Sequence, residues 1–218
     1  ALSKAGNRLD MGGQVFHQAE LLRRFDPVQL MNQPLRKPRR ISDAQRADAI
    51  RVLKNTMLLT CRETDPATYL DRSALRVHDL ERGLCVALFG MLPARQLPLE
   101  SYVGFTLFKN GLAVAYGGAW LMGERAAFGM NIFEQYRGGE SGFMMCQVLR
   151  AYRQTFGVRY FEVDAHQFGR DNPDGIASGA YWFYWRHGFR SLTPGLRALA
   201  ERERQRIAAQ PGYRSPEK

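Results

Sequence analysis

Cysteine is scarce in this chain, whose 218 residues contain only Cys61, Cys85 and Cys146. The number is odd and no two of them form a CxxC pair, so the sequence predicts neither a disulfide framework nor a zinc site. We expect each thiol to behave as a small core side chain. The pattern also favours a reducing compartment, and we therefore expect a cytoplasmic location.

Long apolar runs and several familiar catalytic signatures are also missing. No stretch of about 18 apolar residues occurs, so we expect no membrane span. The sequence contains no Walker loop, no dinucleotide fingerprint and no local Ser-His-Asp signature, and its histidines lack ligand spacing, so no metal is predicted. The first residues include no initiator Met and no apolar core of a signal peptide. We therefore expect the sequence to be an excerpt of a longer protein.

Positive charge is abundant instead. The chain has 31 Lys and Arg against 21 Asp and Glu, a formal net charge of +10, concentrated in the first fifty residues and the tail. The run at residues 36–40 is typical of a solvated linker, although such charge also attracts anionic partners such as an acyl carrier protein or tRNA. We expect a basic extension at 1–41, a folded domain at 42–195 and a charged helix with a tail at 196–218.

Helices are indicated by local signals in the first third of the chain. Ser42 and Gln45 form a capping-box pattern, and apolar residues recur at helical spacing after it, which predicts a helix ending near Cys61. Pro66 is placed to begin a second helix, predicted to continue toward Gly83. A shorter helix candidate covers residues 15–25.

Strand patterns dominate the middle of the chain. The Asn110-Gly111 pair is a strong two-residue hairpin signal between two of the predicted strands. The predicted strands cover residues 84–91, 102–108, 112–122, 126–133 and 158–164, with a helix at 143–155 before the last. This order predicts an α/β (α+β) fold with a mixed, mainly antiparallel sheet and helices on both faces. The strands carrying Ile132 and Val163 should be neighbours that splay apart near their ends.

The turn after residue 133 is the most informative segment. It leads from a predicted strand into an amphipathic helix and contains Gly138 and Gly139. Such a turn directs backbone N–H groups and a helix N-terminus at one place, which suits a phosphate or another anion. Two glycines before a helix can also serve only to reverse the chain.

The order of strand, Gly turn, helix, strand and an aromatic helix ending at Gly188-Phe189 resembles the GCN5-related N-acetyltransferase (GNAT) superfamily, over roughly residues 42–195. The resemblance implies a GNAT-like acyl-CoA N-acyltransferase fold. It implies transfer of an acyl group from a thioester, either acetyl-CoA or another acyl-CoA or an acyl carrier protein, to a small-molecule or peptide amine. An aminoacyl-tRNA-dependent transferase and a non-catalytic binding module of the same fold stay open.

The resemblance also implies a set of donor-binding residues around the turn. By position they are Gln135, Arg137, Gly138, Gly139, Ser141 and Gly142. Glu140 departs from the family pattern, because a small residue is expected there and a carboxylate beside a pyrophosphate is unfavourable. Two interpretations follow. Glu140 turns outward in the first helical turn, where the dipole favours an anion. Alternatively it is functional, and receives a cationic substrate amine or acts as a base in a site that does not hold CoA.

Proton transfer requires an acid and a base. Tyr184 lies four residues before Gly188, where the resemblance implies a general acid that protonates the leaving thiolate. A packed aromatic face is the alternative. Glu134, Asp164 and His166 are base candidates at strand ends, with Asp164 also placed to contact substrate. His166 is preferred because imidazole titrates near neutrality.

Overall fold

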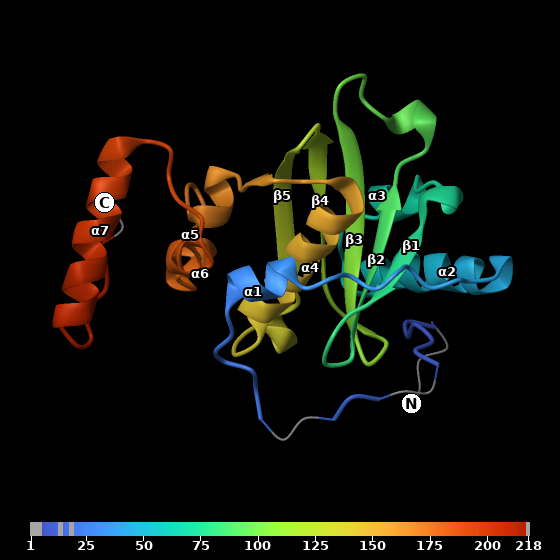
Figure 1. Cartoon of the computed structure of the whole chain (residues 1–218), viewed down its shortest axis with the longest axis horizontal. Coiled ribbons are helices and arrows are strands. Elements are labelled where there is room, and N and C mark those ends of the chain that lie inside the picture. The colour runs from blue at the N-terminus through green and yellow to red at the C-terminus, as the bar shows by residue number, and fades with distance from the viewer. Residues whose placement is uncertain (1–5, 13–14, 18–19, 217–218) are drawn as a thin grey trace. The chain divides into compact units, whose positions relative to one another are not determined.

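The computed structural model describes residues 6–12, 15–17 and 20–216. The chain divides into two compact units, Ala1–Val163 and Asp164–Lys218, which are described separately (Figure 1). The boundaries expected near residues 41 and 195 do not coincide with this division.

Unit 1 is built on a six-stranded sheet with the strand order β1-β2-β3-β4-β5-β6. Neighbours from β1 to β5 are antiparallel, whereas β5 and β6 are parallel. The strands are β1 (Arg76–Asp79), β2 (Leu84–Gly90), β3 (Ser101–Lys109), β4 (Leu112–Met122), β5 (Arg125–Ile132) and β6 (Tyr160–Glu162). The predicted mixed, mainly antiparallel sheet is therefore confirmed, although its last strand is shorter than expected.

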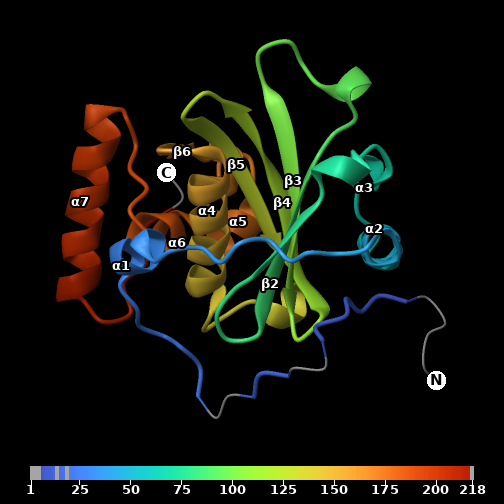
Figure 2. The same ribbon diagram turned by 45° about the vertical axis from the view of Figure 1, so that its right-hand side comes forward.

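Helices cover both faces of this sheet. Figure 2 shows α2 (Asp43–Leu59) and α3 (Asp65–Thr68) on one side, and α1 (Pro27–Asn32) and α4 (Ser141–Phe156) on the other. On the α4 side, Tyr152 packs edge-on against Phe105 and Phe128, and its hydroxyl donates to the carbonyl of Val103 at 2.6 Å. Burial on both faces explains why β2 is a continuous apolar run rather than an alternating one.

Two local signals formed the structures they predicted. Ser42 and Gln45 make the reciprocal hydrogen bonds of a capping box at the start of α2. Asn110 and Gly111 have φ angles of 51° and 83°, the conformation of a tight hairpin between β3 and β4. A Cβ on Gly111 would lie 2.4 Å from the carbonyl oxygen of Leu9, so the close approach of the N-terminal segment also requires glycine here.

Two predicted helices are wrong. After the four-residue α3 the chain forms a 3-10 turn, η1 (Arg72–Ala74), and then β1 rather than a helix reaching Gly83. Leu75 and Val77 are both buried. The spacing of the apolar residues suggested a helix, but the segment forms a strand because its backbone pairs with β2. In the segment 15–25 the described residues are not helical, and α1 begins later at Pro27; residues 18 and 19 lie outside the described part.

The regular elements in the described part of unit 2 are helices joined by turns and short irregular segments. It contains a 3-10 turn, η4 (Ala165–Phe168), followed by α5 (Pro173–Ala177), α6 (Ala180–Arg186) and α7 (Pro194–Ala209). The charged helix predicted near the C-terminus is thus confirmed and begins at Pro194. Among the helices described in either unit, none has the length and apolar character needed to cross a membrane.

The three cysteines differ in their surroundings. Cys85 and Cys146 are buried, and burial raises the pKa of each thiol to about 12. Cys61 is exposed just after α2, so the expectation that it packs in the core is wrong. The described residues contain no group of His, Cys, Asp and Glu side chains that could hold a metal ion.

Candidate functional site

The Gly turn of unit 1 is closed by its own backbone and one serine. It follows β5 and a 3-10 turn, η3 (Glu134–Tyr136), and leads into α4. Gly138 has a φ of 124°, a conformation that favours glycine. Its N–H donates to the Ser141 hydroxyl at 3.0 Å, and the Ser141 N–H donates back to the Gly138 carbonyl at 3.0 Å. This reciprocal pair of hydrogen bonds closes the turn.

The N-terminus of α4 lacks a cap. Glu140 occupies the N-cap position, but its side chain makes no capping hydrogen bond. Within the described residues, the amides of Gly139, Gly142 and Phe143 donate to no other group. A helix of 16 residues concentrates partial positive charge at such an end. The exposed turn before it is therefore suited to an anion.

The Glu140 carboxylate turns toward two cations. Its side chain is only 7 % exposed and forms ion pairs with Arg82 at 3.0 Å and Lys109 at 2.5 Å. It also accepts the N–H of Leu22 at 3.0 Å. Arg82 lies in the turn between β1 and β2, and Lys109 ends β3. The expectation that Glu140 projects outward from the first helical turn is therefore wrong.

These ion pairs reduce the electrostatic repulsion between Glu140 and an anion bound at the turn. Two cations surround one carboxylate, so the group formed by Arg82, Lys109 and Glu140 carries a formal charge of +1. The like-charge repulsion expected between Glu140 and a pyrophosphate is offset by its own partners. Because the same partners already occupy the carboxylate, we assign Glu140 to the architecture of the turn rather than to a substrate amine.

Arg137 adds an accessible cation to the turn. Its side chain is exposed, and its Nε donates to the carbonyl of Ile132 at 3.0 Å. That bond fixes the stem of the guanidinium, while its two terminal nitrogens bind no other group in the described part of the chain. Glu134 and Gln135 are exposed on η3 beside it. The predicted donor-binding residues are thus neighbours on one exposed turn.

The edge of β5 next to this turn is open. β6 pairs only with Arg125, Ala126 and Ala127, and the register ends at Glu162. In unit 1, the last five residues of β5, from Phe128 to Ile132, have no partner on that side. The expected pairing of these neighbours is therefore confirmed, although β6 ends at Glu162, before Val163, and the splaying of the strand ends stays a prediction. The open edge leads directly to the Gly turn.

No protein-family model, curated protein or solved structure matches this chain. The resemblance to the GNAT superfamily consequently depends on the motifs and on the arrangement of strand, turn and helix described above.

The predicted acid and base both lie in unit 2. Tyr184 is buried, its hydroxyl donates to Gln167 Oε1 at 2.8 Å, and burial raises its pKa to about 12. It also packs against Phe168, Phe183 and Phe189, so the expected aromatic packing is present as well. Gln167 was not predicted as a partner, and only its position next to His166 could have suggested it.

His166 is exposed and oriented through its backbone neighbours. Its Nδ1 lies 3.1 Å from the carbonyl oxygen of Arg170. A carbonyl can only accept, so in the neutral ring Nδ1 carries the proton and Nε2 is left as a proton acceptor. The Asp164 carboxylate accepts the His166 N–H at 2.8 Å and caps η4. Unit 2 thus brings Asp164, His166 and, through Gln167, Tyr184 into one small group.

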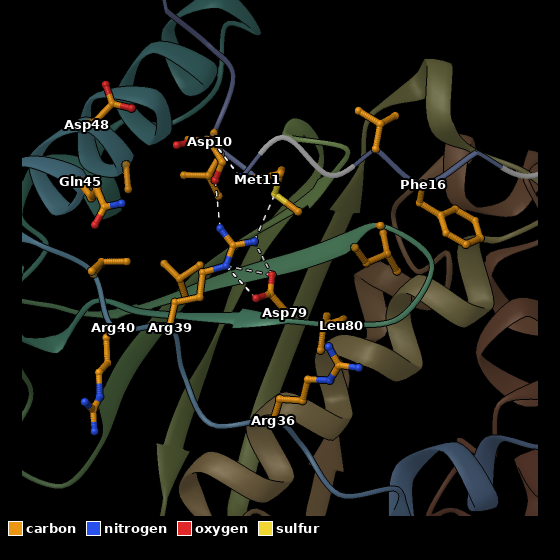
Figure 3. Close-up of a pocket in the computed structure, with 18 of the residues that line it drawn as sticks. Asp10, Met11, Phe16, Arg36, Arg39, Arg40, Gln45, Asp48, Asp79 and Leu80 are labelled. Atoms are coloured by element: carbon orange, nitrogen blue, oxygen red, sulfur yellow. Dashed lines mark hydrogen bonds and ion pairs between the residues drawn. The ribbon is translucent and has the colours of Figure 1, made fainter.

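A separate cavity of about 990 Å³ lies on the α2 side of unit 1 (Figure 3). The Arg39 guanidinium occupies its centre, where it forms an ion pair with Asp79 and donates to the Asp10 carbonyl at 2.9 Å. The interpretation of residues 36–40 as a solvated linker is therefore wrong for Arg39. None of the predicted site residues lines this cavity.

Proposed function

We propose that this protein is a GNAT-like N-acyltransferase that binds an acyl-CoA type of thioester donor at the Gly turn of unit 1. One observation carries the proposal. The N-terminus of α4 has orphan amides and no cap, while Glu140 is withdrawn into ion pairs with Arg82 and Lys109. A helix with this N-terminus gains stability from a bound phosphate.

Each part of the donor has a partner of matching chemistry in this proposal. The pyrophosphate accepts hydrogen bonds from the amides of Gly139, Gly142 and Phe143, and Arg137 supplies charge. The arm of coenzyme A contains two amide groups, which can add as a strand to the open edge of β5 between Phe128 and Ile132. Acyl-CoA is a cytoplasmic metabolite, so a cytoplasmic location belongs to the same proposal.

The reaction forms a C–N bond and breaks a C–S bond. The acceptor amine attacks the thioester carbonyl, a base takes the amine proton, and the departing thiolate takes a proton from an acid. His166 suits the base role because its Nε2 is the accepting nitrogen. The resemblance assigns the acid role to Tyr184, whose raised pKa makes its proton harder to release and whose hydroxyl must leave Gln167 to act.

Calorimetric titration of the full chain with CoA tests the donor assignment. Arg137→Ala should weaken CoA binding roughly ten- to hundredfold, because a charge-assisted hydrogen bond contributes about 1.5–3 kcal/mol. Arg153→Ala is the matched control, since it removes the same exposed charge at the opposite end of α4. Arg153 lies about 18 Å along the helix from Ser141, beyond a screening length of about 10 Å.

The donor classes are separated by a parallel titration with an acyl carrier protein. If neither CoA nor the carrier protein binds, both thioester donors are refuted, which leaves an aminoacyl-tRNA donor or a non-catalytic module. Thioester binding without release of thiol in the presence of amines would support the module. Equal loss of affinity in Arg137→Ala and Arg153→Ala would show only a general charge effect.

A further inference from the structure

Residues 20–25, here called the N-terminal strap, contact the Gly turn and the start of α4. A Cβ built on Gly139 would lie 2.8 Å from Cδ1 of Leu21, so this side chain rests directly against Gly139. Further along, Phe25 packs edge-on against Phe143 of α4 with ring centroids 5.6 Å apart. The strap therefore contacts, at Gly139 and Phe143, the same short segment that contains the orphan amides.

Two backbone hydrogen bonds fasten the strap to the ion pair beneath the turn. The Leu22 N–H donates to Glu140 Oε1 at 3.0 Å, and Arg82 Nη2 donates to the Glu20 carbonyl at 3.1 Å. Glu140 and Arg82 are themselves 3.0 Å apart. The carboxylate that departs from the family pattern thus has a second role, because it anchors the strap as well as the turn.

The contact between Leu21 and Gly139 is chemically mismatched. An isobutyl side chain cannot accept a hydrogen bond, so Leu21 lies against Gly139 without satisfying its amide. A phosphate at the same place would accept from these amides. A phosphate bound there would therefore compete with Leu21 for the space beside Gly139.

We propose that the N-terminal strap is a built-in competitor of the thioester donor, which must displace Leu21 from Gly139 in order to bind. This inference rests on the proposed function and concerns its regulation. Release of the strap breaks the Leu22 and Glu20 hydrogen bonds but leaves Glu140 paired with Arg82 and Lys109. The turn therefore keeps its shape while its surface opens.

The fraction of molecules in which the strap is closed sets how much it weakens the apparent affinity for the donor. If the strap is closed in 90–99 % of molecules, as an assumed range, the apparent dissociation constant for the donor is raised by roughly ten- to hundredfold. Variants that open the strap should remove that factor. The strap is suited to such a balance because its described contacts at the turn include exposed side-chain packing by Leu21 and single hydrogen bonds, which a bound phosphate can replace.

Two substitutions in the full chain weaken the strap by different means. Leu21→Gly removes the side chain over Gly139, and Leu22→Pro removes the N–H that donates to Glu140. Each should tighten CoA binding about ten- to hundredfold in calorimetry. Leu99→Gly is the matched control, because Leu99 is 82 % exposed in the loop between β2 and β3 and should leave CoA affinity unchanged.

Trypsin provides a second measurement on the unmodified chain. Arg23 and Arg24 are exposed cleavage sites inside the strap, and a fastened strap resists entry into a protease cleft. Saturating CoA should therefore accelerate cleavage at these two residues relative to cleavage elsewhere. Protection of the sites by CoA would overturn the inference.

The outcomes separate the strap from the proposed function. If CoA binds the wild type and both strap variants equally, the strap inference is overturned and the donor assignment stands. If CoA binds none of them, the donor assignment fails and the inference fails with it. Should Leu22→Pro not fold, Leu21→Gly decides alone, since Leu21 is 50 % exposed and its loss leaves the core intact.

Discussion

Replacing Glu140 with glutamine probes the ion pairs that hold the turn, the start of α4 and the strap together. The substitution keeps the size of the side chain and removes its charge. It leaves Arg82 and Lys109 without their shared carboxylate, and it weakens the acceptor of the Leu22 N–H. Loss of one partner from a buried pair typically costs 3–5 kcal/mol because the remaining charge is uncompensated.

The structure places the expected cost at or below the lower end of that range. Glu140 is 7 % exposed, but the side chains of Arg82 and Lys109 keep 24 % and 23 % of their surface in water. Water can therefore solvate both cations in part once the carboxylate charge is removed, and we expect the free energy of unfolding to fall by about 2–3 kcal/mol. With a urea dependence of about 2 kcal/mol per molar, the midpoint should fall by about 1–1.5 M.

Urea unfolding followed by far-UV circular dichroism measures this change. The dependence of the unfolding free energy on urea concentration should be the same in both proteins, so that a shift of the midpoint reports a change in stability. Glu162→Gln is the matched control, because Glu162 pairs with Arg125 at the surface, where both side chains are over 40 % exposed, and it should leave the midpoint unchanged. Hydrogen exchange at the Leu22 amide should also quicken in Glu140→Gln only. A shift no larger than the control would show that the ion pairs are not structural and refute the argument.

Two further predictions concern other titrating groups. The general-acid role implied for Tyr184 predicts that Tyr184→Phe lowers acyl-transfer turnover by roughly two to four orders of magnitude. The same substitution removes the hydrogen bond to Gln167, which should lower the free energy of unfolding by about 1 kcal/mol in urea. Unchanged turnover would refute the general-acid role. Burial acts to raise the pKa of Glu81, but hydrogen bonds from Arg150 and Gln147 outweigh it and hold that pKa below its ordinary value. A carboxylate whose pKa is lowered by folding stabilises the fold fully when the pH is above its ordinary, unfolded-state pKa, and this contribution is lost as the pH falls toward the folded-state pKa. The urea midpoint should therefore fall as the pH drops below about 4, and Glu81→Gln should flatten this dependence on pH.

Local chemistry is the part of this fold that the sequence predicts well. The capping box at Ser42, the hairpin at Asn110-Gly111 and the glycine turn before α4 each depend on residues within a few positions of one another. The segment after α3 was predicted wrongly because four residues of β1 carry too little periodicity to distinguish a strand from a helix. Only pairing with β2 decides between them.

The candidate site likewise has features that depend on local sequence and features that depend on contacts between distant segments. The turn around Gly138 and the helix that follows it depend on a short stretch of sequence and were expected from it. The missing cap of α4 and the unpaired end of β5 were not expected. The direction of the Glu140 carboxylate did not follow, because its partners Lys109 and Arg82 lie 31 and 58 residues away along the chain.

The strap is still more remote, since Leu22 reaches Glu140 across 118 residues. Nothing in the local pattern at residues 20–25 distinguishes a helix from an extended segment fastened to an ion pair. The sequence by itself therefore indicated a turn suited to an anion, through glycines and a helix start. Only the tertiary structure decided what neutralises the carboxylate there and what covers the site, because both depend on charges and side chains brought together by folding.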